Sequence, residues 1–376
     1  MKQHTIIVGA GIIGLATAEK MLREGFNVLL LEQGKVGKEA SWAGGGILSP
    51  LIPWNYSEAV TRLTQYSARI YSDWTSTLHA LTGTDPEYTK CGMFILPPYN
   101  IKAAMNWCSE YDIRMHLSNL SRLIPSKNFE AINRCDRMQQ AIHLPDIAQI
   151  RNPKLLQALH QRVIQLGGEI IESCKVQHLI VKQNSVKQLQ TSSGRFAADY
   201  YIIAAGAWST QILGQHAHNL IIKPVCGQML LFKFQNPPIP AILVQNSSYL
   251  VPRKDGHLLV GSTSEEKGFN KQITANAKKQ LMEKALTVLP QLYKMPIIRQ
   301  WSGLRPASPQ NIPTIGQHPD LTNLFINSGH FRYGVTMAPA SAEILTNAIM
   351  GLSQPIDTNP YQAGWINYSH KSRHEV

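Results

Sequence analysis

The fold class of this chain is decided by one stretch near its start, His4-Thr5-Ile6-Ile7-Val8-Gly9-Ala10-Gly11-Ile12-Ile13-Gly14. Its first residues predict a buried strand, and the glycines that follow predict a tight turn. An amphipathic pattern then predicts a helix up to about residue 23, and residues 27–31 predict a second buried strand. The order of strand, helix and strand predicts a βαβ unit with two parallel strands.

Three glycines of this stretch, Gly9, Gly11 and Gly14, have the spacing of a dinucleotide-binding turn. Such glycines permit a tight turn, a close approach of the backbone to a pyrophosphate, and contact between helix and strand. The amide groups at the helix start would face the phosphates, and Glu32 would accept hydrogen bonds from ribose hydroxyls. The motif does not distinguish NAD from FAD, but its position, with further cofactor contacts expected late in the chain, favours FAD.

Two later segments support an FAD site. Residues 198–206 predict a buried strand that ends in small residues, where backbone can pass close to a cofactor, although an ordinary core strand has the same pattern. The loop Ser328-Gly329-His330-Phe331-Arg332-Tyr333-Gly334 precedes a helix that we predict from about residue 339 to residue 350. Amide groups at that helix start would stabilise negative charge on a reduced flavin.

The remaining pattern predicts a second, β-rich part of the chain. Helices are expected over residues 57–81, with Ser57 as N-cap, over 152–166, with Asn152 as N-cap, and over 275–289. Antiparallel strands are expected over residues 225–234 and 248–262, the latter with a hairpin turn at Lys254-Asp255-Gly256.

These elements predict an α/β fold, a Rossmann-like FAD-binding domain with a second, antiparallel-sheet substrate domain inserted. We expect residues 1–88, 145–222 and 306–376 in the discontinuous FAD-binding domain and residues 89–144 and 223–305 in the substrate domain. A length of 376 residues agrees with two domains.

Composition narrows the possible partners. With 36 Lys+Arg against 24 Asp+Glu, the net charge is +12, and such an excess is typical of proteins that bind nucleic acid. The basic residues are dispersed along the chain, however, so we expect no nucleic-acid partner. No apolar stretch approaches the roughly 20 residues that span a bilayer, so no membrane partner is expected and a cytoplasmic location is predicted. The apolar start resembles a leader peptide, but its glycines and the following helix favour a retained strand and helix.

Cysteine and histidine spacing predicts no metal site. The five cysteines lie without a CxxC pair and are interpreted as reduced thiols in a reducing compartment: Cys91, Cys108, Cys135, Cys174 and Cys226. His216 and His218 are expected to lie alone in a polar loop.

Several ordered motifs resemble one enzyme family. They are Ser41-Trp42-Ala43-Gly44-Gly45-Gly46-Ile47-Leu48-Ser49-Pro50, then Val251-Pro252-Arg253, Trp301-Ser302-Gly303-Leu304-Arg305-Pro306, and Gly329 to Gly334. The chain thereby resembles, nearly from end to end, the glycine oxidases of the thiamine pathway, FAD-dependent amine oxidases related to D-amino-acid oxidase and sarcosine oxidase.

The resemblance implies an activity. Glycine and other small amines, such as sarcosine and small D-amino acids, would be oxidised to an imine and on to glyoxylate, with molecular oxygen reduced to hydrogen peroxide and the product feeding thiazole formation. It also implies a homo-oligomer. Covalent relatives attach their flavin through a Cys in the segment that corresponds to Gly303-Leu304-Arg305, and Arg305 stands there instead, so FAD should be non-covalent.

The resemblance also implies site residues. Arg305, with Arg332 and Tyr249 beside it, would act on the substrate, Arg305 binding its carboxylate. The implied cofactor-binding residues are Gly9, Gly11, Ile12, Ile13, Gly14, Glu32, Gln33, Ala40, Ser41, Gly45, Gly46, Ile47, Val176, Gly206, His330, Phe331, Arg332, Tyr333, Gly334, Val335 and Thr336.

The chemistry of arginine supports the role of Arg305, because its planar guanidinium matches a carboxylate in two parallel hydrogen bonds. A structural ion pair is the alternative for this residue. Two departures from the family pattern, Cys226 in place of a frequent Lys and Thr314 in place of a frequent Tyr, put the preferred amine in doubt. Two other functions stay open: a quinone-linked D-amino-acid or proline dehydrogenase, and an RNA-modifying flavoprotein.

Overall fold

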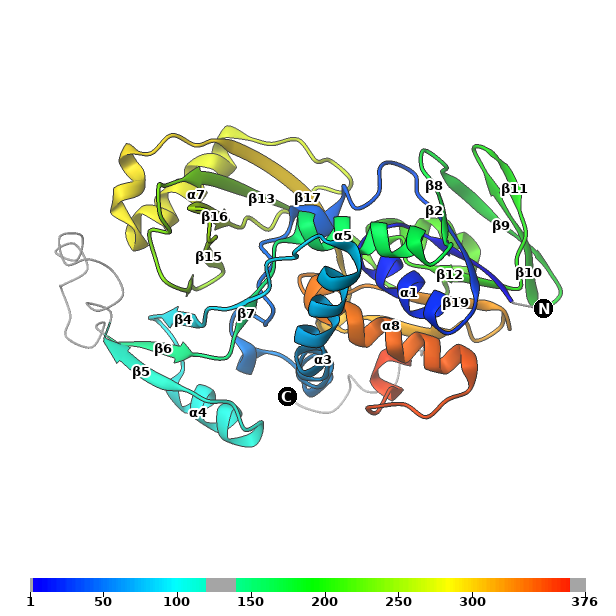
Figure 1. Ribbon diagram of the computed structural model, residues 1–376, viewed down its shortest axis with the longest axis horizontal. Helices are drawn as coiled ribbons and strands as arrows, with labels where there is room; N and C mark the ends of the chain where they lie inside the picture. Colours follow the sequence, from blue (N-terminus) through cyan, green and yellow to red (C-terminus); the bar gives the residue numbers. More distant parts are fainter. Residues whose placement is uncertain (1–2, 120–139, 366–376) are drawn as a thin grey trace.

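The structure, a computed structural model, describes residues 3–119 and 140–365 and is built on two large sheets (Figure 1). Six strands form one sheet in the order β18-β19-β12-β1-β2-β8, and eight form the other in the order β17-β13-β16-β15-β14-β4-β6-β5. In Figure 1 the larger sheet and helix α7 occupy the left of the molecule, and the smaller sheet with helices α1 and α8 occupies the right.

The six-stranded sheet contains the predicted βαβ unit. Strand β1 pairs in parallel with β2 and with β12, and only the edge strand β18 is antiparallel to its neighbour β19. The strands are β1 (His4–Val8), β2 (Asn27–Leu31), β8 (Glu169–Ile171), β12 (Tyr200–Ile203), β18 (Thr314–Gln317) and β19 (Leu324–Ser328). Carboxyl ends of parallel strands meet at one edge of a sheet, and this edge is where a dinucleotide is expected.

Four helices and a small sheet cover this six-stranded sheet. Helix α1 packs against α8 and α5, and α3 packs against α8 and α5, so that one apolar core lies beneath them. Their bounds are α1 (Ile12–Arg23), α3 (Glu58–Thr82), α5 (Asn152–Gln165) and α8 (Gly334–Met350). A second core lies on the other face, below the three-stranded sheet of β9 (Val176–Lys182), β10 (Ser185–Thr191) and β11 (Gly194–Phe196).

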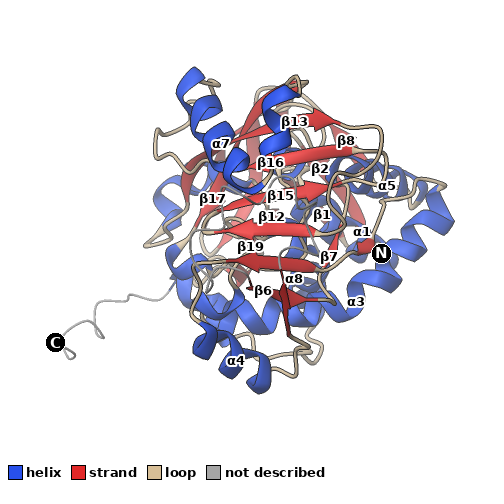
Figure 2. Cartoon of the chain, turned by 90° about the vertical axis from the view of Figure 1, so that its left-hand side faces the viewer, coloured by secondary structure: helices blue, strands red, loops and turns tan. Residues whose placement is uncertain are grey.

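The eight-stranded sheet is antiparallel except where β14 pairs with β4. Figure 2 shows its strands β13, β16 and β15 one below another, in the order of the sheet. The strands are β4 (Met93–Leu96), β5 (His116–Asn119), β6 (Gln140–Leu144), β13 (Lys223–Lys233), β14 (Ile242–Gln245), β15 (Ser248–Pro252), β16 (His257–Gly261) and β17 (Arg299–Ala307). Helix α7 (Ala275–Val288) covers one face of this sheet and encloses its core.

Short elements complete the described chain. They are α2 (Ala40–Ala43), α4 (Ile101–Glu110), α6 (Ser209–Leu213), the paired strands β3 (Thr89–Lys90) and β7 (Ala148–Gln149), and six 3₁₀ turns, η1 (Pro53–Asn55), η5 (Gly206–Trp208), η6 (Gly214–Ala217), η7 (Pro290–Lys294), η8 (Pro309–Asn311) and η9 (Asn359–Trp365).

The predicted α/β fold class is confirmed, with a parallel sheet and a separate, mainly antiparallel one. The strands of the larger sheet come from residues 93–144 and 223–307. These ranges agree with the expected substrate domain, and the division of the chain into two domains stays a prediction. Cys135 lies outside the described residues, and the other four cysteines are free thiols.

The predicted start of the last helix near residue 339 is wrong. Helix α8 begins five residues earlier, at Gly334, and contains Pro339. Pro339 has no amide hydrogen, so it cannot donate to the carbonyl of Val335 four residues before it. The hydroxyl of Tyr71, in α3, donates to that carbonyl instead, at 3.0 Å, and the helix continues through the proline.

The two predicted helix caps also behave differently from expectation. Ser57 occupies the N-cap position of α3, but its hydroxyl makes no capping hydrogen bond. Asn152 is the first residue inside α5, after Arg151 as N-cap, and does not cap the helix either. Its side-chain amide donates instead to the carbonyls of Ser41 (2.8 Å) and Gly44 (3.1 Å). The Asn152 side chain therefore binds a distant segment of the chain and not the end of its own helix.

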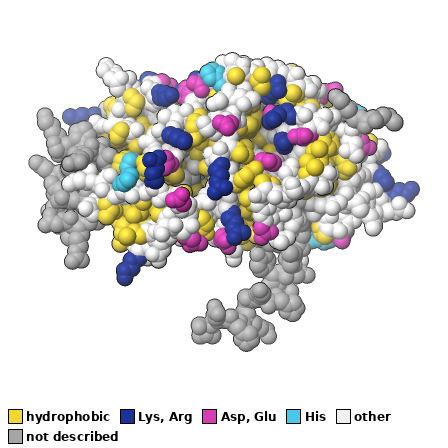
Figure 3. Space-filling view, turned by 60° about the horizontal axis from the view of Figure 1, so that its bottom comes forward, with side chains coloured by type: hydrophobic (Ala, Val, Ile, Leu, Met, Phe, Trp, Pro, Cys, Tyr) yellow, Lys and Arg dark blue, Asp and Glu magenta, His cyan; other side chains and the backbone are white. Residues whose placement is uncertain are grey.

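The distribution of charged side chains on the surface agrees with the dispersed pattern seen in the sequence. Figure 3 shows Lys and Arg side chains of one face interspersed with Asp and Glu, without one continuous basic field. Many charges pair locally, such as Lys20 with Glu24 and Lys35 with Glu172. Within the described ranges, no helix combines the length and apolar character needed to cross a membrane.

Replacing Tyr71 with Phe tests the hydrogen bond that lets α8 pass through Pro339. Tyr71 is 1% exposed, and loss of its hydroxyl leaves the carbonyl of the half-buried Val335 without this donor. We expect the free energy of unfolding, measured by urea titration, to fall by about 1–3 kcal/mol. The control Tyr99→Phe removes an exposed hydrogen bond to a backbone carbonyl, that of Gln140 (3.0 Å), and should cost less than about 1 kcal/mol because water can replace the hydroxyl. Equal losses in the two variants would contradict this account.

Candidate functional site

A long cavity of about 410 Å³ opens at the carboxyl edge of the six-stranded sheet. Its lining comes from the turn after β1, the end of β2, the segment around α2, and the loop between β19 and α8. Among the predicted cofactor-binding residues, those that line it are Gly9, Gly11, Ile12, Ile13, Glu32, Gln33, Ala40, Ser41, Val176, Gly206, His330, Phe331, Arg332, Gly334 and Val335.

The glycine turn after β1 has the geometry that the motif predicts. Gly9 has φ +104°, and a Cβ there would lie 2.6 Å from the carbonyl oxygen of Ala204. A Cβ on Gly14 would overlap the carbonyl of Gly9, which explains why Gly14 serves helix–strand contact and does not line the cavity. The first amides of a helix lack partners within the helix and can bind an anion. In this structure the amide of Ile12 donates to the hydroxyl of Ser41 at 2.9 Å, which ties the glycine turn to the segment around α2.

Glu32 is held at the cavity wall by two backbone amides. Its Oε2 accepts from the amide of Ala10 and its Oε1 from the amide of Gly34, both at 2.9 Å. The side chain is 7% exposed, and burial raises the pKa of its carboxyl group. Each carboxylate oxygen keeps a further lone pair, so Glu32 can still accept hydrogen bonds from a ribose.

The loop after β19 lies across the cavity from this turn. His330 is 1% exposed, shares a hydrogen bond with the Ser341 hydroxyl at 2.9 Å, and has its pKa lowered to about 3 by burial. It is therefore neutral, and it ties the loop to α8. The amide of Phe331 donates to the carbonyl of Pro306 at 2.9 Å, which joins the loop to β17. Thr336, predicted to line the flavin, does not line the cavity, and its hydroxyl donates to the carbonyl of Ile47 at 3.1 Å.

A second, smaller cavity of about 70 Å³ adjoins the first. The two share Ala40, Gly44, Arg305, Arg332 and Val335 in their walls. The small cavity is also lined by the other predicted residues Gly45, Gly46, Ile47, Tyr249 and Tyr333. A cavity that just holds one water measures about 10–15 Å³ on the same scale, so this one admits a ligand of only a few heavy atoms.

Arg305 brings a positive charge to the wall between the two cavities. Strand β17 carries it opposite Val225 of β13, and its guanidinium donates to the carbonyl of Thr263 (3.1 Å) and the hydroxyl of Ser262 (2.7 Å). No acidic residue of the described chain forms an ion pair with it, so the structural ion pair considered from the sequence is not found. Burial lowers the pKa of Arg305, as expected for a charge that lacks an anionic partner. An anion in the small cavity would complete this site.

Arg332 and Tyr249 lie beside Arg305, as predicted. Tyr249, in β15, is 7% exposed and lines the small cavity, and Arg332 lines both cavities with its guanidinium 5.2 Å from the Phe331 ring centroid. Tyr333 closes another side, where its hydroxyl donates to that of Tyr56. The small cavity therefore has two cationic and two phenolic side chains around an otherwise apolar and glycine-rich wall.

Three glycines make room for these side chains, and two of them, Gly227 and Gly261, were not assigned to the site from the sequence. A Cβ on Gly227 would overlap the guanidinium of Arg305. Cβ atoms on Gly45 and Gly261 would lie 2.8 Å and 2.5 Å from the Tyr249 ring. Gly227 and Gly261 are on strands next to those of Arg305 and Tyr249, so only the cross-strand register reveals their role.

Other lining residues were also missed from the sequence. The long cavity includes Trp208 and Asn327, and the small cavity includes Asn152 and Ser262. The two departures from the family pattern, Cys226 and Thr314, line neither cavity.

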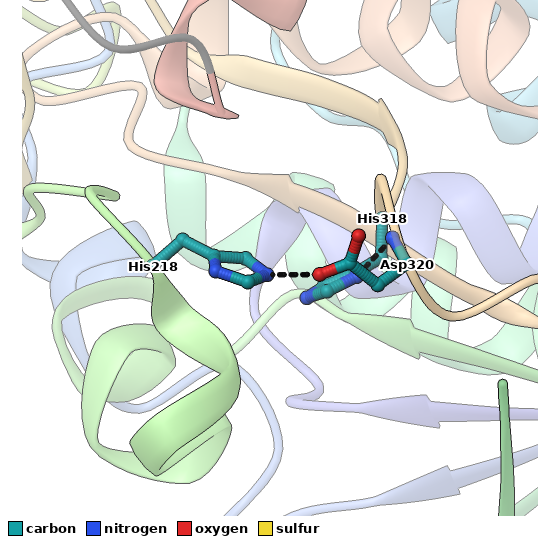
Figure 4. Close-up of side chains that lie close together, drawn as sticks. All are labelled: His218, His318 and Asp320. Carbon is teal, nitrogen blue, oxygen red and sulfur yellow. Dashed lines mark hydrogen bonds and ion pairs between the residues drawn. The ribbon is translucent and has the colours of Figure 1, made fainter. Parts of the chain in front are cut away.

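His216 and His218 do not lie alone, which corrects the sequence interpretation. His218 pairs with Asp320 at 2.9 Å, next to His318 (Figure 4), and these three are the one group of close potential metal ligands within the described residues. The ring of His318 is already occupied on both sides. Its Nδ1 accepts from the amides of Asp320 (3.0 Å) and Leu321 (3.2 Å), and its Nε2 donates to the carbonyl of His216 (2.8 Å). Metal binding would break these bonds, so this group stabilises a turn.

Comparisons with known proteins agree with the geometry. The chain is 37% identical to a glycine oxidase of Pseudomonas putida over 363 residues, 96% of this chain and 98% of that protein. It is 29% identical to the bifunctional protein ThiO/ThiG of Trichormus variabilis, a match that covers 93% of this chain and 53% of that protein. The crystal structure of glycine oxidase from Geobacillus kaustophilus has a similar fold, with a TM-score of 0.87 at 23% identity, covering 98% of this chain and 100% of that one.

The model of the DAO family, described as FAD dependent oxidoreductase, matches residues 4–348. That range includes the glycine turn, Glu32, both cavities and the loop before α8. The chain therefore belongs to the DAO family of FAD-dependent oxidoreductases.

Proposed function

We propose that this enzyme is a glycine oxidase. It oxidises glycine, and to a lesser extent sarcosine and small D-amino acids, to the imine, while molecular oxygen is reduced to hydrogen peroxide. Water hydrolyses the imine from glycine to glyoxylate and ammonia. The imine or its hydrolysis product feeds thiazole formation in thiamine biosynthesis. The observation that carries the proposal is the small cavity with Arg305 in its wall, a cation that pairs with no acidic residue in the part of the chain that the structure describes.

The long cavity suits FAD bound without a covalent link. The glycine turn and the first amides of α1 would hold the pyrophosphate, Glu32 and Gln33 the adenosine ribose, and Val176 the adenine. The segment at Ala40, Ser41 and Gly45 to Ile47 and the loop 330–336 would hold the isoalloxazine ring. Cys174 is the one cysteine of the described chain in this lining, and its amide donates to the carbonyl of Glu32, at the adenosine end. The bound FAD supplies the acceptor for a hydride from the substrate and passes two electrons to oxygen.

The residues of the chain bind and orient the substrate. Arg305 would hold the carboxylate of the amino acid in two parallel hydrogen bonds, with Arg332 and Tyr249 beside it. This would leave the amino group and Cα available to face the isoalloxazine ring held in the adjoining cavity. A base is not required when the amine binds in its neutral form, so orientation and electrostatics are the main contributions of the protein. The limited volume of the small cavity favours glycine over amino acids with large side chains.

Two other functions are distinguishable from this proposal. A quinone-linked dehydrogenase would yield little peroxide in air, and an RNA-modifying flavoprotein would bind tRNA with steep salt dependence. The 37% identity over nearly the whole of a glycine oxidase supports the oxidase. A homo-oligomeric state and a cytoplasmic location stay predictions.

A substrate panel with peroxide detection tests the reaction. We expect purified, yellow protein to form one peroxide and one glyoxylate for each glycine consumed in air, with lower kcat/KM for D-valine than for glycine because of the cavity size. Absence of peroxide with glycine, sarcosine and D-alanine, while an artificial quinone is reduced, would contradict the oxidase and support the dehydrogenase.

Replacement of Arg305 with Met tests carboxylate binding. The loss of charge-assisted hydrogen bonds, each worth about 1.5–3 kcal/mol, should raise the KM for glycine about 100-fold or more. Arg299→Met is a matched control, because Arg299 lies on the same strand but stacks on Trp42 outside both cavities. Its KM should stay close to that of wild type. A KM unchanged in Arg305→Met would refute the assignment.

Replacement of Gly227 with Ala tests the space that Arg305 needs. The added methyl group would overlap the guanidinium and displace it, so we expect the KM for glycine to rise by at least about tenfold. A double-mutant cycle separates this effect from general damage to the sheet. In an Arg305→Met background, Gly227→Ala should raise KM little further. Fully additive effects would show that Gly227 acts independently of Arg305.

A further inference from the structure

Arg253 is a buried arginine that contacts the wall of the small cavity from the side away from the cavity. It follows β15, is 5% exposed, and takes part in none of the ion pairs found in the described parts of the chain. Its Nη1 donates to the Gln149 side-chain oxygen (2.8 Å) and the Ile150 carbonyl (2.9 Å), and its Nη2 donates to the Gly45 carbonyl (2.9 Å). One guanidinium thus joins the β15–β16 hairpin, the residues before α5 and the wall of the small cavity.

The wall segment, residues 41–47, is held almost entirely through its carbonyl groups. Besides Arg253, its donors are the Asn152 amide on Ser41 and Gly44, the Trp301 indole on Ala43 (3.0 Å), the Ile150 amide on Gly46 (2.8 Å) and the Thr336 hydroxyl on Ile47. Only Arg253 among these donors carries a charge. Charge-assisted hydrogen bonds are roughly twice as strong as neutral ones, so Arg253 is the strongest single restraint on the segment.

The restraint matters because the segment contains three consecutive glycines. Glycine has no Cβ and populates more backbone conformations than any other residue, and Gly46 here has φ +71°. A trans peptide unit is planar, with its carbonyl and its amide pointing in opposite directions. By fixing the Gly45 carbonyl, Arg253 therefore also fixes the direction of the Gly46 amide, on the side away from the guanidinium. Gly45, Gly46 and Ile47 all line the small cavity.

The guanidinium also fits this place better than any other side chain. It donates to two carbonyls, those of Ile150 and Gly45, which lie about a hundred residues apart in the sequence. Because the guanidinium is rigid and planar, it makes both hydrogen bonds with little loss of conformational entropy. Burial lowers its pKa to about 10, so the group still carries its charge at neutral pH. The neighbouring cation, Arg151, forms ion pairs with Glu87 and Asp255 near the surface, whereas Arg253 donates to uncharged groups.

We infer that Arg253 is a positioning residue for the oxidation: it fixes the Gly45–Gly46 peptide unit and thereby the cavity wall that orients the substrate against FAD. The inference rests on the proposed function for its kinetic part. Arg253 does not line either cavity, so it acts through the glycine segment and touches neither substrate nor cofactor.

Kinetics of Arg253→Lys and Arg253→Met, per bound FAD, test the inference. Lys keeps the buried charge but cannot span both carbonyls, and Met keeps the approximate volume without charge. We expect kcat to fall about 100-fold in Arg253→Met and at least about fivefold in Arg253→Lys, because small misplacements are costly for orientation. The dissociation constant of glycolate, a non-amine carboxylate followed by the flavin spectrum, should change less than threefold, since Arg305 is unaltered. Arg151→Met is the matched control and should keep wild-type values.

Hydrogen exchange supplies a readout that does not depend on glycine oxidation. Amides of peptides covering residues 41–48 should exchange faster in both Arg253 variants than in wild type, while α7 stays unchanged. If Arg253→Met does not fold, Arg253→Lys decides the question. A wild-type kcat per bound FAD in Arg253→Lys, an equal weakening of glycolate binding, or unaltered exchange over residues 41–48 would overturn the inference. Failure of wild type to oxidise glycine, with faster exchange in the variants, would reject the proposed function and leave the positioning of the segment intact.

Discussion

The charge of Arg305, half-buried and without an acidic partner among the described residues, is the constraint on which the site depends. The protein satisfies this guanidinium with a carbonyl and a hydroxyl, which solvate a cation but do not neutralise it. The strand beside it must carry glycine at position 227, because any side chain would occupy the same space. Arg305 thus keeps its positive charge in the wall between the two cavities, where a small carboxylate could pair with it. The sizes of the two cavities agree with this arrangement. The larger one, of about 410 Å³, would take the dinucleotide, and the smaller one, of about 70 Å³, would take a small amino acid.

Backbone, more than side chains, forms the surface between the two ligands. The glycine turn after β1 and the segment 41–47 both use glycine where a Cβ would collide with neighbouring atoms, and both are held by hydrogen bonds from distant parts of the chain. This explains how a chain with 26 glycines keeps a defined site, since each flexible stretch at the cavities is restrained from outside. Asn152, Arg253 and Trp301 supply these restraints from three different elements.

Local features of the sequence predicted most of the fold, and tertiary features account for what was missed. The βαβ unit, with Glu32 at the end of its second strand, was predictable because its signals lie within thirty residues. The start of α8 was not, because the hydroxyl of Tyr71, more than 260 residues away, replaces the bond that Pro339 cannot make. The pairing of His218 with Asp320 and the role of Gly227 likewise depend on contacts between distant segments. Arg305, Arg332 and Tyr249 were named only through a family resemblance, and the structure brings all three to one cavity.

The central claim is that a small amino acid held by Arg305 reduces FAD bound in the adjoining cavity. Anaerobic mixing of the purified holoenzyme with glycine tests it most directly, because the visible absorption of oxidised flavin reports electron transfer without any oxygen chemistry. The account predicts that glycine bleaches this absorption and that admission of air restores it. Unchanged absorption after addition of glycine, sarcosine and D-alanine would contradict it.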